Sequence, residues 1–143
     1  MNEFYKKNII SVRDLDKQKL ELIFDATDKI IDMSQDKRRE IARGKTLGYL
    51  FFEPSTRTRL SFESAIALLG GTSVGIADAA SSSIHKGETL GDTVKVISSY
   101  CDVLVLRHSL DGSSRFAAEI SNKPVINAGS GTEEHPTQTI QDL

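Results

Sequence analysis

Tryptophan is absent from this 143-residue chain, and cysteine occurs only once, as Cys101. A single cysteine excludes an internal disulfide. Cys101 lies just before the apolar run Val103 to Leu106, and a lone thiol in such a setting is more often a small core residue than a nucleophile. We therefore expect it to pack in the core and to have no chemical role.

An excess of either charge is also missing. Lysine and arginine together number 18 against 20 for aspartate and glutamate, and the formal net charge is -2. This balance gives no general electrostatic reason to bind nucleic acid or an anionic membrane. Any site for an anion must therefore be built locally.

Long apolar runs do not occur at the start of the chain. Residues 1–10 include Glu3, Lys6 and Lys7, so this segment is interpreted as neither a signal peptide nor a membrane anchor. We expect a cytoplasmic protein. A chain of this length is the size of one ordinary domain with one sizeable core.

The first helical pattern covers residues 15–33. Its apolar residues at helical spacing are Leu20, Ile23, Phe24, Ile30 and Ile31. Asp14 or Asp16 is placed to cap this helix, which we expect to lie on the surface. The polar stretch Ser34 to Arg43 is interpreted as the frayed end of the helix or as a loop.

From Lys45 onward, short apolar runs alternate with helical patterns. The apolar runs are residues 47–52, 73–77, 103–106 and 125–127, and the helical patterns are residues 60–69, 89–100, 113–120 and a helix that starts at His135-Pro136. Short apolar strands separated by helices indicate a parallel sheet joined by right-handed crossovers. The sequence therefore predicts an α/β fold, with a parallel sheet of about four strands and helices on both faces.

Polar residues follow each predicted strand. In open α/β sheets, ligands bind beyond the carboxyl ends of the strands. The first such loop places three hydroxyls and two guanidinium groups in residues 55–59, where a helix begins. Free N–H groups, the helix dipole and an arginine fork all favour a phosphate dianion there. The alternative is that Ser55 or Thr56 caps the helix and that both arginines are solvated.

The later loops each supply further candidates and a plainer alternative for each. Ser82 and Lys86 lie in a loop of small residues that either reaches away from its own domain or is simply solvated. Arg107 directly follows four apolar strand residues, so it either meets a ligand or forms a salt bridge at the sheet edge. His135 and Gln138 either face one ligand at the helix N-terminus, or Gln138 turns back to cap the helix at His135.

Five motifs carry a resemblance to one family. They are Phe-Phe-Glu-Pro-Ser-Thr-Arg-Thr-Arg-Leu-Ser-Phe-Glu at 51–63, Ser82 with Lys86-Gly87-Glu88, Val105-Leu106-Arg107-His108, Asn127-Ala128-Gly129, and His135-Pro136-Thr137-Gln138-Thr139. In this order, and over nearly the whole chain, they resemble the aspartate and ornithine carbamoyltransferase family. The Phe-Glu-Pro lead and His-Pro-Thr-Gln resemble the aspartate-specific members, since the ornithine-specific members commonly have cysteine in place of Thr137.

The resemblance implies that the carbamoyl group of carbamoyl phosphate is transferred to the amine of L-aspartate, a step of pyrimidine biosynthesis. It implies that the phosphate is held by Ser55, Thr56, Arg57 and Thr58, the carbonyl oxygen by Thr58, Arg107 and His135, and the carbamoyl NH₂ by Gln138. The catalytic residues would be Arg57, Thr58, Arg107 and His135. Preplaced donors of this kind stabilise negative charge that develops on the carbonyl oxygen. No metal, cofactor or covalent intermediate is implied.

The resemblance also implies a homotrimer in which Ser82 and Lys86 enter the active site of a neighbouring subunit. Whether a regulatory chain is bound stays open. Family members have two domains and about twice this length, so residues 1–143 are expected to be the carbamoyl-phosphate-binding domain without the aspartate-binding domain, and to turn over little alone. The residues leave two alternatives open: half of an ornithine carbamoyltransferase, and a non-catalytic module that binds carbamoyl phosphate or phosphate.

Three positions depart from the family pattern. Ser109 stands where a proline is usual, residues 130–134 are more acidic than usual, and His85 precedes Lys86. We expect the carboxylates of Glu133 and Glu134 to weaken phosphate affinity, and His85 to make it pH-sensitive.

Overall fold

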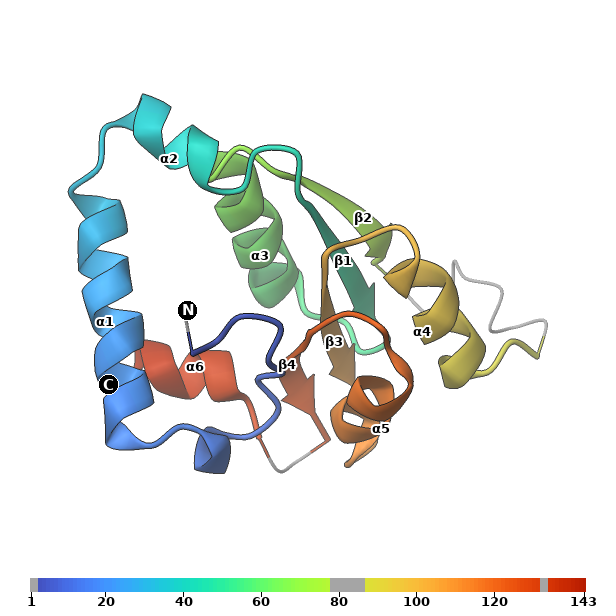
Figure 1. The fold of residues 1–143 in the computed structure, drawn as a ribbon. Helices are drawn as coiled ribbons and strands as arrows, with labels where there is room; N and C mark the ends of the chain where they lie inside the picture. Colours follow the sequence, from blue (N-terminus) through green and yellow to red (C-terminus); the bar gives the residue numbers. More distant parts are fainter. Residues whose placement is uncertain (1–2, 78–86, 132–133) are drawn as a thin grey trace.

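The computed structural model describes residues 3–77, 87–131 and 134–143 (Figure 1). The helices are the short 3-10 helix η1 (Val12–Asp14), then α1 (Lys17–Ile31), α2 (Gln35–Ile41), α3 (Thr56–Leu68), α4 (Leu90–Ser98), α5 (Ser113–Ile120) and α6 (Pro136–Gln141). The strands are β1 (Thr46–Phe51), β2 (Thr72–Ile76), β3 (Val103–His108) and β4 (Val125–Ser130).

The four strands form one parallel sheet in the order β2-β1-β3-β4. Leu50 of β1 pairs with Leu106 of β3, which in turn pairs with Asn127 of β4. The predicted parallel sheet of about four strands is thus confirmed. Strand β3 extends two residues, and β4 three residues, beyond the apolar runs that predicted them.

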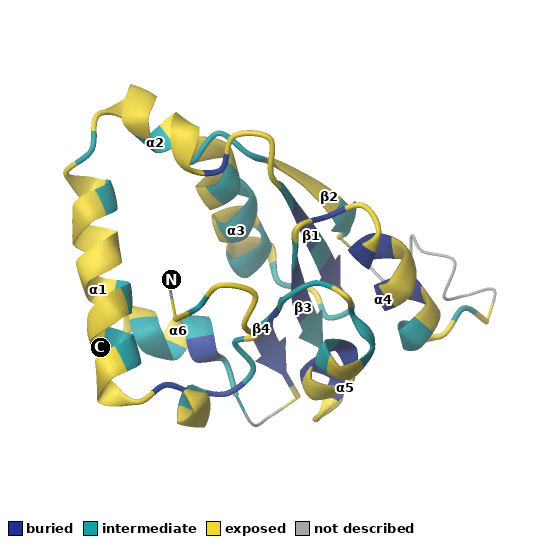
Figure 2. Ribbon diagram, viewed as in Figure 1, coloured by how far each residue is buried: buried dark blue, intermediate teal, exposed yellow. Residues whose placement is uncertain are grey.

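Helices cover both faces of the sheet, as expected. On one face, α4 and α5 pack on a core of strand residues that includes Leu50, Leu104 and Leu106, all fully buried. On the other face, Phe62 and Ile66 of α3 pack against buried strand residues such as Phe51. Figure 2 shows the resulting pattern: β1, β3 and β4 are largely buried and dark, whereas the edge strand β2 is mostly exposed. The continuous apolar runs in the sequence follow from this double burial.

The connections reverse direction between β1 and β3. The chain leaves β1 through α3 on one face and leaves β3 through α5 on the other, while the two strands lie side by side in the sheet. Such a point opens a crevice beyond the carboxyl ends of the two strands. The fold therefore places the ends of β1 and β3 at the natural ligand position.

In the N-terminal half of the chain, the segment after α1 was predicted wrongly. Asp16 caps α1 by accepting from the Lys19 N–H, as one of the two expected caps. The segment Ser34 to Arg43, however, is not a frayed end or loop: it folds as the separate helix α2. No residue of α1 or α2 is buried, so apolar spacing carried little information about where one helix ends and the next begins.

An extended segment near the start of the chain lies along the outer edge of β4. Ile9 forms a parallel bridge with Ile126, its N–H donates to the Val125 carbonyl over 2.9 Å, and its carbonyl accepts from the Asn127 N–H over 2.8 Å. This edge of the sheet is therefore covered by backbone from the other end of the sequence.

The single cysteine is buried in the core beneath α4, where burial raises the pKa of the Cys101 thiol. The interpretation of Cys101 as a core residue is thereby confirmed. Among the described residues no helix has both the length and the apolar character needed to cross a bilayer. The cytoplasmic location stays a prediction.

Candidate functional site

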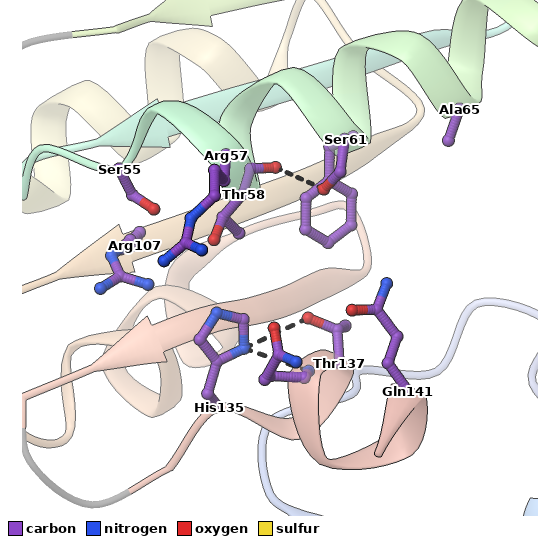
Figure 3. A pocket seen from close by; sticks show the side chains of 11 residues that line it. Ser55, Arg57, Thr58, Ser61, Ala65, Arg107, His135, Thr137 and Gln141 are labelled. Carbon is purple, nitrogen blue, oxygen red and sulfur yellow. Dashed lines mark hydrogen bonds between the residues drawn. The ribbon is translucent and has the colours of Figure 1, made fainter. Parts of the chain in front are cut away.

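A cleft of about 660 Å³ opens beyond the carboxyl ends of β1 and β3. It is lined by Ser55, Arg57, Thr58, Ser61, Phe62, Ala65, Arg107, His135, Thr137, Gln138 and Gln141. Figure 3 shows side chains of α3 facing those of α6 across the cleft, with Arg107 entering from the end of β3. The lining residues include two arginines and no acidic residue, so the cleft is suited to an anion.

The start of α3 presents unused hydrogen-bond donors to this cleft. Ser55 is the N-cap residue, but its hydroxyl makes no capping hydrogen bond, and the first turn contains no acidic residue. The alternative in which the Ser55 side chain caps the helix is therefore wrong. The backbone N–H groups of the first turn and the positive end of the helix dipole remain available to a ligand.

Arg57 and Thr58 follow Ser55 in the first turn. The Arg57 side chain is exposed and has no ion-pair partner among the residues that the structure describes. Arg59, by contrast, forms an ion pair with Glu63 over 3.0 Å and lies outside the cleft lining. Thr56 is exposed and does not line the cleft, so its role stays a prediction.

Arg107 is held at the end of β3 by two contacts. Its Nη2 forms a salt bridge with Glu53 over 3.0 Å, and its Nη1 donates to the Ala128 carbonyl over 3.1 Å. Its Nε is buried and lacks a hydrogen-bond partner among the described residues. The salt bridge that the sequence left open is thus present, and the same side chain also lines the cleft.

His135 is the N-cap residue of α6. Its Nδ1 accepts from the Gln138 backbone N–H over 3.3 Å, which places the proton of the neutral ring on Nε2. Burial, and next the positive charge of Arg107, lower the pKa of His135 below its ordinary value of 6.5. A neutral ring with one outward N–H is a hydrogen-bond donor that adds no charge to the cleft.

Gln138 lines the cleft one turn into α6, but its side chain does not turn back on His135. Its Nε2 donates instead to the Asp142 carboxylate over 3.1 Å. The contact between the two residues runs from the Gln138 backbone to the His135 ring. The alternative in which the Gln138 side chain caps the helix is therefore wrong: the His135 ring is the cap, and it accepts from the Gln138 backbone N–H.

Glu134 does not face the cleft, contrary to expectation. Its carboxylate accepts from the Ser11 hydroxyl over 2.9 Å and from the Val12 N–H over 3.1 Å. The expectation that Glu134 weakens phosphate affinity is therefore unsupported, because its charge is engaged by donors of the N-terminal segment. Glu133, Ser82, His85 and Lys86 lie outside the described residues.

Sequence reasoning missed five of the residues that line the cleft, namely Ser61, Phe62, Ala65, Thr137 and Gln141. A signal was present, because Thr58, Ser61, Phe62 and Ala65 follow the spacing of one helix face. Within residues 3–77, 87–131 and 134–143, no group of three or more metal-ligating side chains comes together.

Comparisons with known proteins agree with one another. Residues 7–143 match the family described as aspartate/ornithine carbamoyltransferase, carbamoyl-P binding domain. The aspartate carbamoyltransferase catalytic subunit of Nitrosopumilus maritimus is 70% identical over all 143 residues, and that of Cenarchaeum symbiosum is 68% identical. This chain covers 46% of each of these two relatives.

Solved structures show the same half-length similarity. The catalytic subunit of M. jannaschii aspartate transcarbamoylase superposes with a TM-score of 0.88 at 46% identity, covering 96% of this chain and 45% of that one. The Trypanosoma cruzi aspartate transcarbamoylase in complex with carbamoyl phosphate and aspartate gives a TM-score of 0.83 at 37% identity, with the same coverage. The chain thus spans about half the length of the relatives that it matches.

Proposed function

Since the chain belongs to the aspartate/ornithine carbamoyltransferase family, we propose that its cleft binds carbamoyl phosphate and that the whole protein transfers the carbamoyl group to L-aspartate. The observation that carries this proposal is the start of α3. It combines an uncapped helix N-terminus with Arg57, which has no ion-pair partner among the described residues, opposite a neutral histidine donor.

The phosphate would lie at the N-terminus of α3, where the hydroxyls of Ser55 and Thr58, the Arg57 guanidinium and the first N–H groups meet. Thr56 would contribute through its backbone. The carbonyl oxygen would then face Arg107 and the His135 Nε2–H, and the carbamoyl NH₂ would face Gln138. In this pose the donors surround the oxygen that becomes negative during the reaction.

The reaction needs no electrons from outside. The amine nitrogen of aspartate forms a bond to the carbonyl carbon, and the bond from that carbon to the phosphate oxygen breaks. Phosphate leaves with the electron pair and takes up the proton that the amine loses. Arg57 and Arg107 would stabilise the charge on the leaving phosphate and on the carbonyl oxygen. No step requires a metal or a cofactor.

The second domain and the assembly are part of the proposal. We infer that residues 1–143 form the carbamoyl-phosphate-binding domain and that an aspartate-binding domain completes the protein, because the relatives are about twice as long. Ser82 and Lys86 would enter the cleft of a neighbouring subunit in a homotrimer. Support for the trimer comes from the motif resemblance alone.

Titration calorimetry with inorganic phosphate and with carbamoyl phosphate tests the site. In Arg57→Ala, loss of a charge-assisted hydrogen bond, about 1.5–3 kcal/mol, should weaken binding roughly 10- to 100-fold. Arg115→Ala is the matched control, because Arg115 also lies in the first turn of a helix but outside the cleft. Equal affinity in the wild type and in Arg57→Ala would overturn the assignment.

The choice of aspartate over ornithine is tested with the natural full-length protein. Carbamoyl phosphate and either amino acid are supplied, and the carbamoylated product is measured. We expect carbamoyl aspartate, because the relatives carry that name and because a lysine such as Lys86 suits a dicarboxylate and repels the second amine of ornithine. Equal or greater citrulline formation would reverse the choice and leave the carbamoyl phosphate site intact.

A further inference from the structure

The N-terminal segment, defined here as residues 9–12, is tied both to β4 and to Glu134, which lies two residues before α6. In β4, Asn127 is 1% exposed and all of its side-chain polar atoms are engaged. Its Nδ2 donates to the Ile10 carbonyl over 2.9 Å and to the Ser130 hydroxyl over 3.1 Å, and its Oδ1 accepts from the Gly129 N–H over 2.9 Å.

At the end of the loop between β4 and α6, Glu134 makes the second tie. Its two carboxylate oxygens take one donor each, the Ser11 hydroxyl and the Val12 N–H, from residues more than 120 positions earlier in the chain. Ser11 itself is 5% exposed. The backbone carbonyl of Glu134 also accepts from the Ser130 N–H over 3.2 Å, so Glu134 is bound to the end of β4 as well.

Two side chains of the cleft lie against the end of β4. Arg107 Nη1 donates to the Ala128 carbonyl, and the Arg107 guanidinium lies over Gly129. His135 is the residue after Glu134, and its ring also lies over Gly129. A shift at Glu134 therefore moves the backbone that carries His135.

We propose that Glu134 is a positioning residue, which fixes His135 in the cleft by tying the end of the loop to Ser11 and Val12. The proposal rests on the proposed function for its catalytic consequence, but the tie itself is a separate physical claim. Hydrogen bonds to a carboxylate are stronger than neutral ones, so this single side chain holds the segment firmly. Glu134, which departs from the usual family pattern, thus has a structural role outside the phosphate site.

The test compares Glu134→Ala with Asp102→Ala in the natural full-length protein. Asp102 is the matched control, because its carboxylate also accepts one backbone N–H, from Thr46, and one side-chain donor, from Lys45. It directly precedes β3, at the amino ends of the strands, whereas the cleft lies beyond their carboxyl ends. Both variants remove a carboxylate that accepts two hydrogen bonds, but only Glu134 is adjacent to His135.

The first readout is the pKa of His135, followed by NMR of its ring protons. His135 faces Arg107 from β3 and Arg57 from α3, and loosening of the loop moves the ring toward solvent and away from these charges. The pKa should then rise toward its ordinary value in Glu134→Ala. Removal of a neighbouring carboxylate acts in the opposite direction, since it lowers the pKa of an imidazole. A rise therefore reports movement rather than lost charge.

The second readout is steady-state kinetics with carbamoyl phosphate. Displacement of His135 should lower kcat/KM about 10-fold or more in Glu134→Ala, since small misplacements of catalytic groups have large effects. Glu134→Gln, whose Oε1 can still accept from the Val12 N–H while its Nε2 donates to the Ser11 hydroxyl oxygen, should recover most of the loss, and Asp102→Ala should retain wild-type kinetics.

Ser11→Ala gives an independent check through a double-mutant cycle. If the tie acts through Ser11, the Ser11→Ala and Glu134→Ala effects on the pKa of His135 should be less than additive. An unchanged or lowered pKa of His135 in Glu134→Ala overturns the proposal, whatever the activity does. If the wild type lacks carbamoyl transfer, the proposed function fails, and the NMR titration still decides the tie.

Discussion

At the scale of single residues, Gly129 is a position beside the cleft where a side chain cannot be accommodated without strain. Its φ of +119° is strained for any residue with a side chain. A Cβ at this position would lie 2.8 Å from Arg107 Nη1 and 3.4 Å from the His135 ring. The glycine therefore provides the space in which the two cleft side chains converge, in addition to its backbone conformation.

Gly129→Ala should accordingly lose both stability and ligand affinity. We expect a backbone cost of about 1–2 kcal/mol, plus a loss of affinity for phosphate of about tenfold as Arg107 is displaced. Gly112→Ala is the control, since Gly112 also has a positive φ, +77°, but no atom within 4 Å of the added Cβ. Urea unfolding and calorimetry measure the two effects. A control that lost phosphate binding equally would show that backbone strain alone explains the result.

At the scale of helices and strands, the first turns of α3 and α4 differ in what their cap residues do. Thr89 at the start of α4 accepts from the Asp92 N–H over 3.1 Å, whereas Ser55 at the start of α3 makes no such bond. A cap residue whose hydroxyl is idle in the unliganded protein contributes nothing to helix stability through that hydroxyl. Ser55 is thus available to a ligand.

Ser55→Ala and Thr89→Ala should therefore have opposite profiles. Thr89→Ala should reduce the free energy of unfolding by about 1 kcal/mol and leave phosphate binding unchanged. Ser55→Ala should leave stability nearly unchanged without ligand and weaken phosphate binding about threefold to tenfold. Chemical denaturation with and without saturating phosphate separates the two. A drop in stability for ligand-free Ser55→Ala equal to that of Thr89→Ala would contradict the idle cap.

Most helices and strands, but not all, could be predicted from the sequence. Strands and the helices that pack on them were predictable from the sequence. Strands buried on both faces need continuous apolar runs, and helices that pack on a sheet need apolar residues at helical spacing. Helix α2 was not predictable, because it buries none of its residues and its cap Ser34 makes no side-chain bond. The sequence wrongly predicted that Glu134 lies near the phosphate site for another reason. Its partners Ser11 and Val12 are distant in sequence, and a local sequence pattern cannot predict such a contact.

At the scale of the whole molecule, the cleft depends on three segments from separate parts of the chain: the start of α3, the end of β3 and the start of α6. Their histidines give the folded protein a distinct response to pH. Burial lowers the pKa of both His108 and His135 below the ordinary value of 6.5. Between their folded and unfolded values, the unfolded chain binds more protons than the folded one.

Stability should therefore fall as the pH drops below about 6.5, because protonation then favours the unfolded chain. Asp92 and Asp102 do not contribute in this range, since their lowered pKa values lie below 3.8 and their contribution is lost only in stronger acid. Urea unfolding at pH 7.5 and at pH 5.5 measures the difference. His108→Gln combined with His135→Gln should flatten the dependence, and an undiminished slope in this double variant would assign it to other groups.

The covered edge of β4 has a consequence for the order in which the molecule forms. Residues 9–12 leave the ribosome well before their partners Val125, Asn127 and Glu134, since Val12 and Glu134 are 122 positions apart in the sequence. During synthesis the N-terminal segment cannot dock until these partners have been made, and the closure of so long a loop is slow. The N-terminal segment therefore docks late in folding. The strand pairs β1 with β2 and β1 with β3 can form before it docks. Until it does, the edge of β4 is open to pairing with other strands.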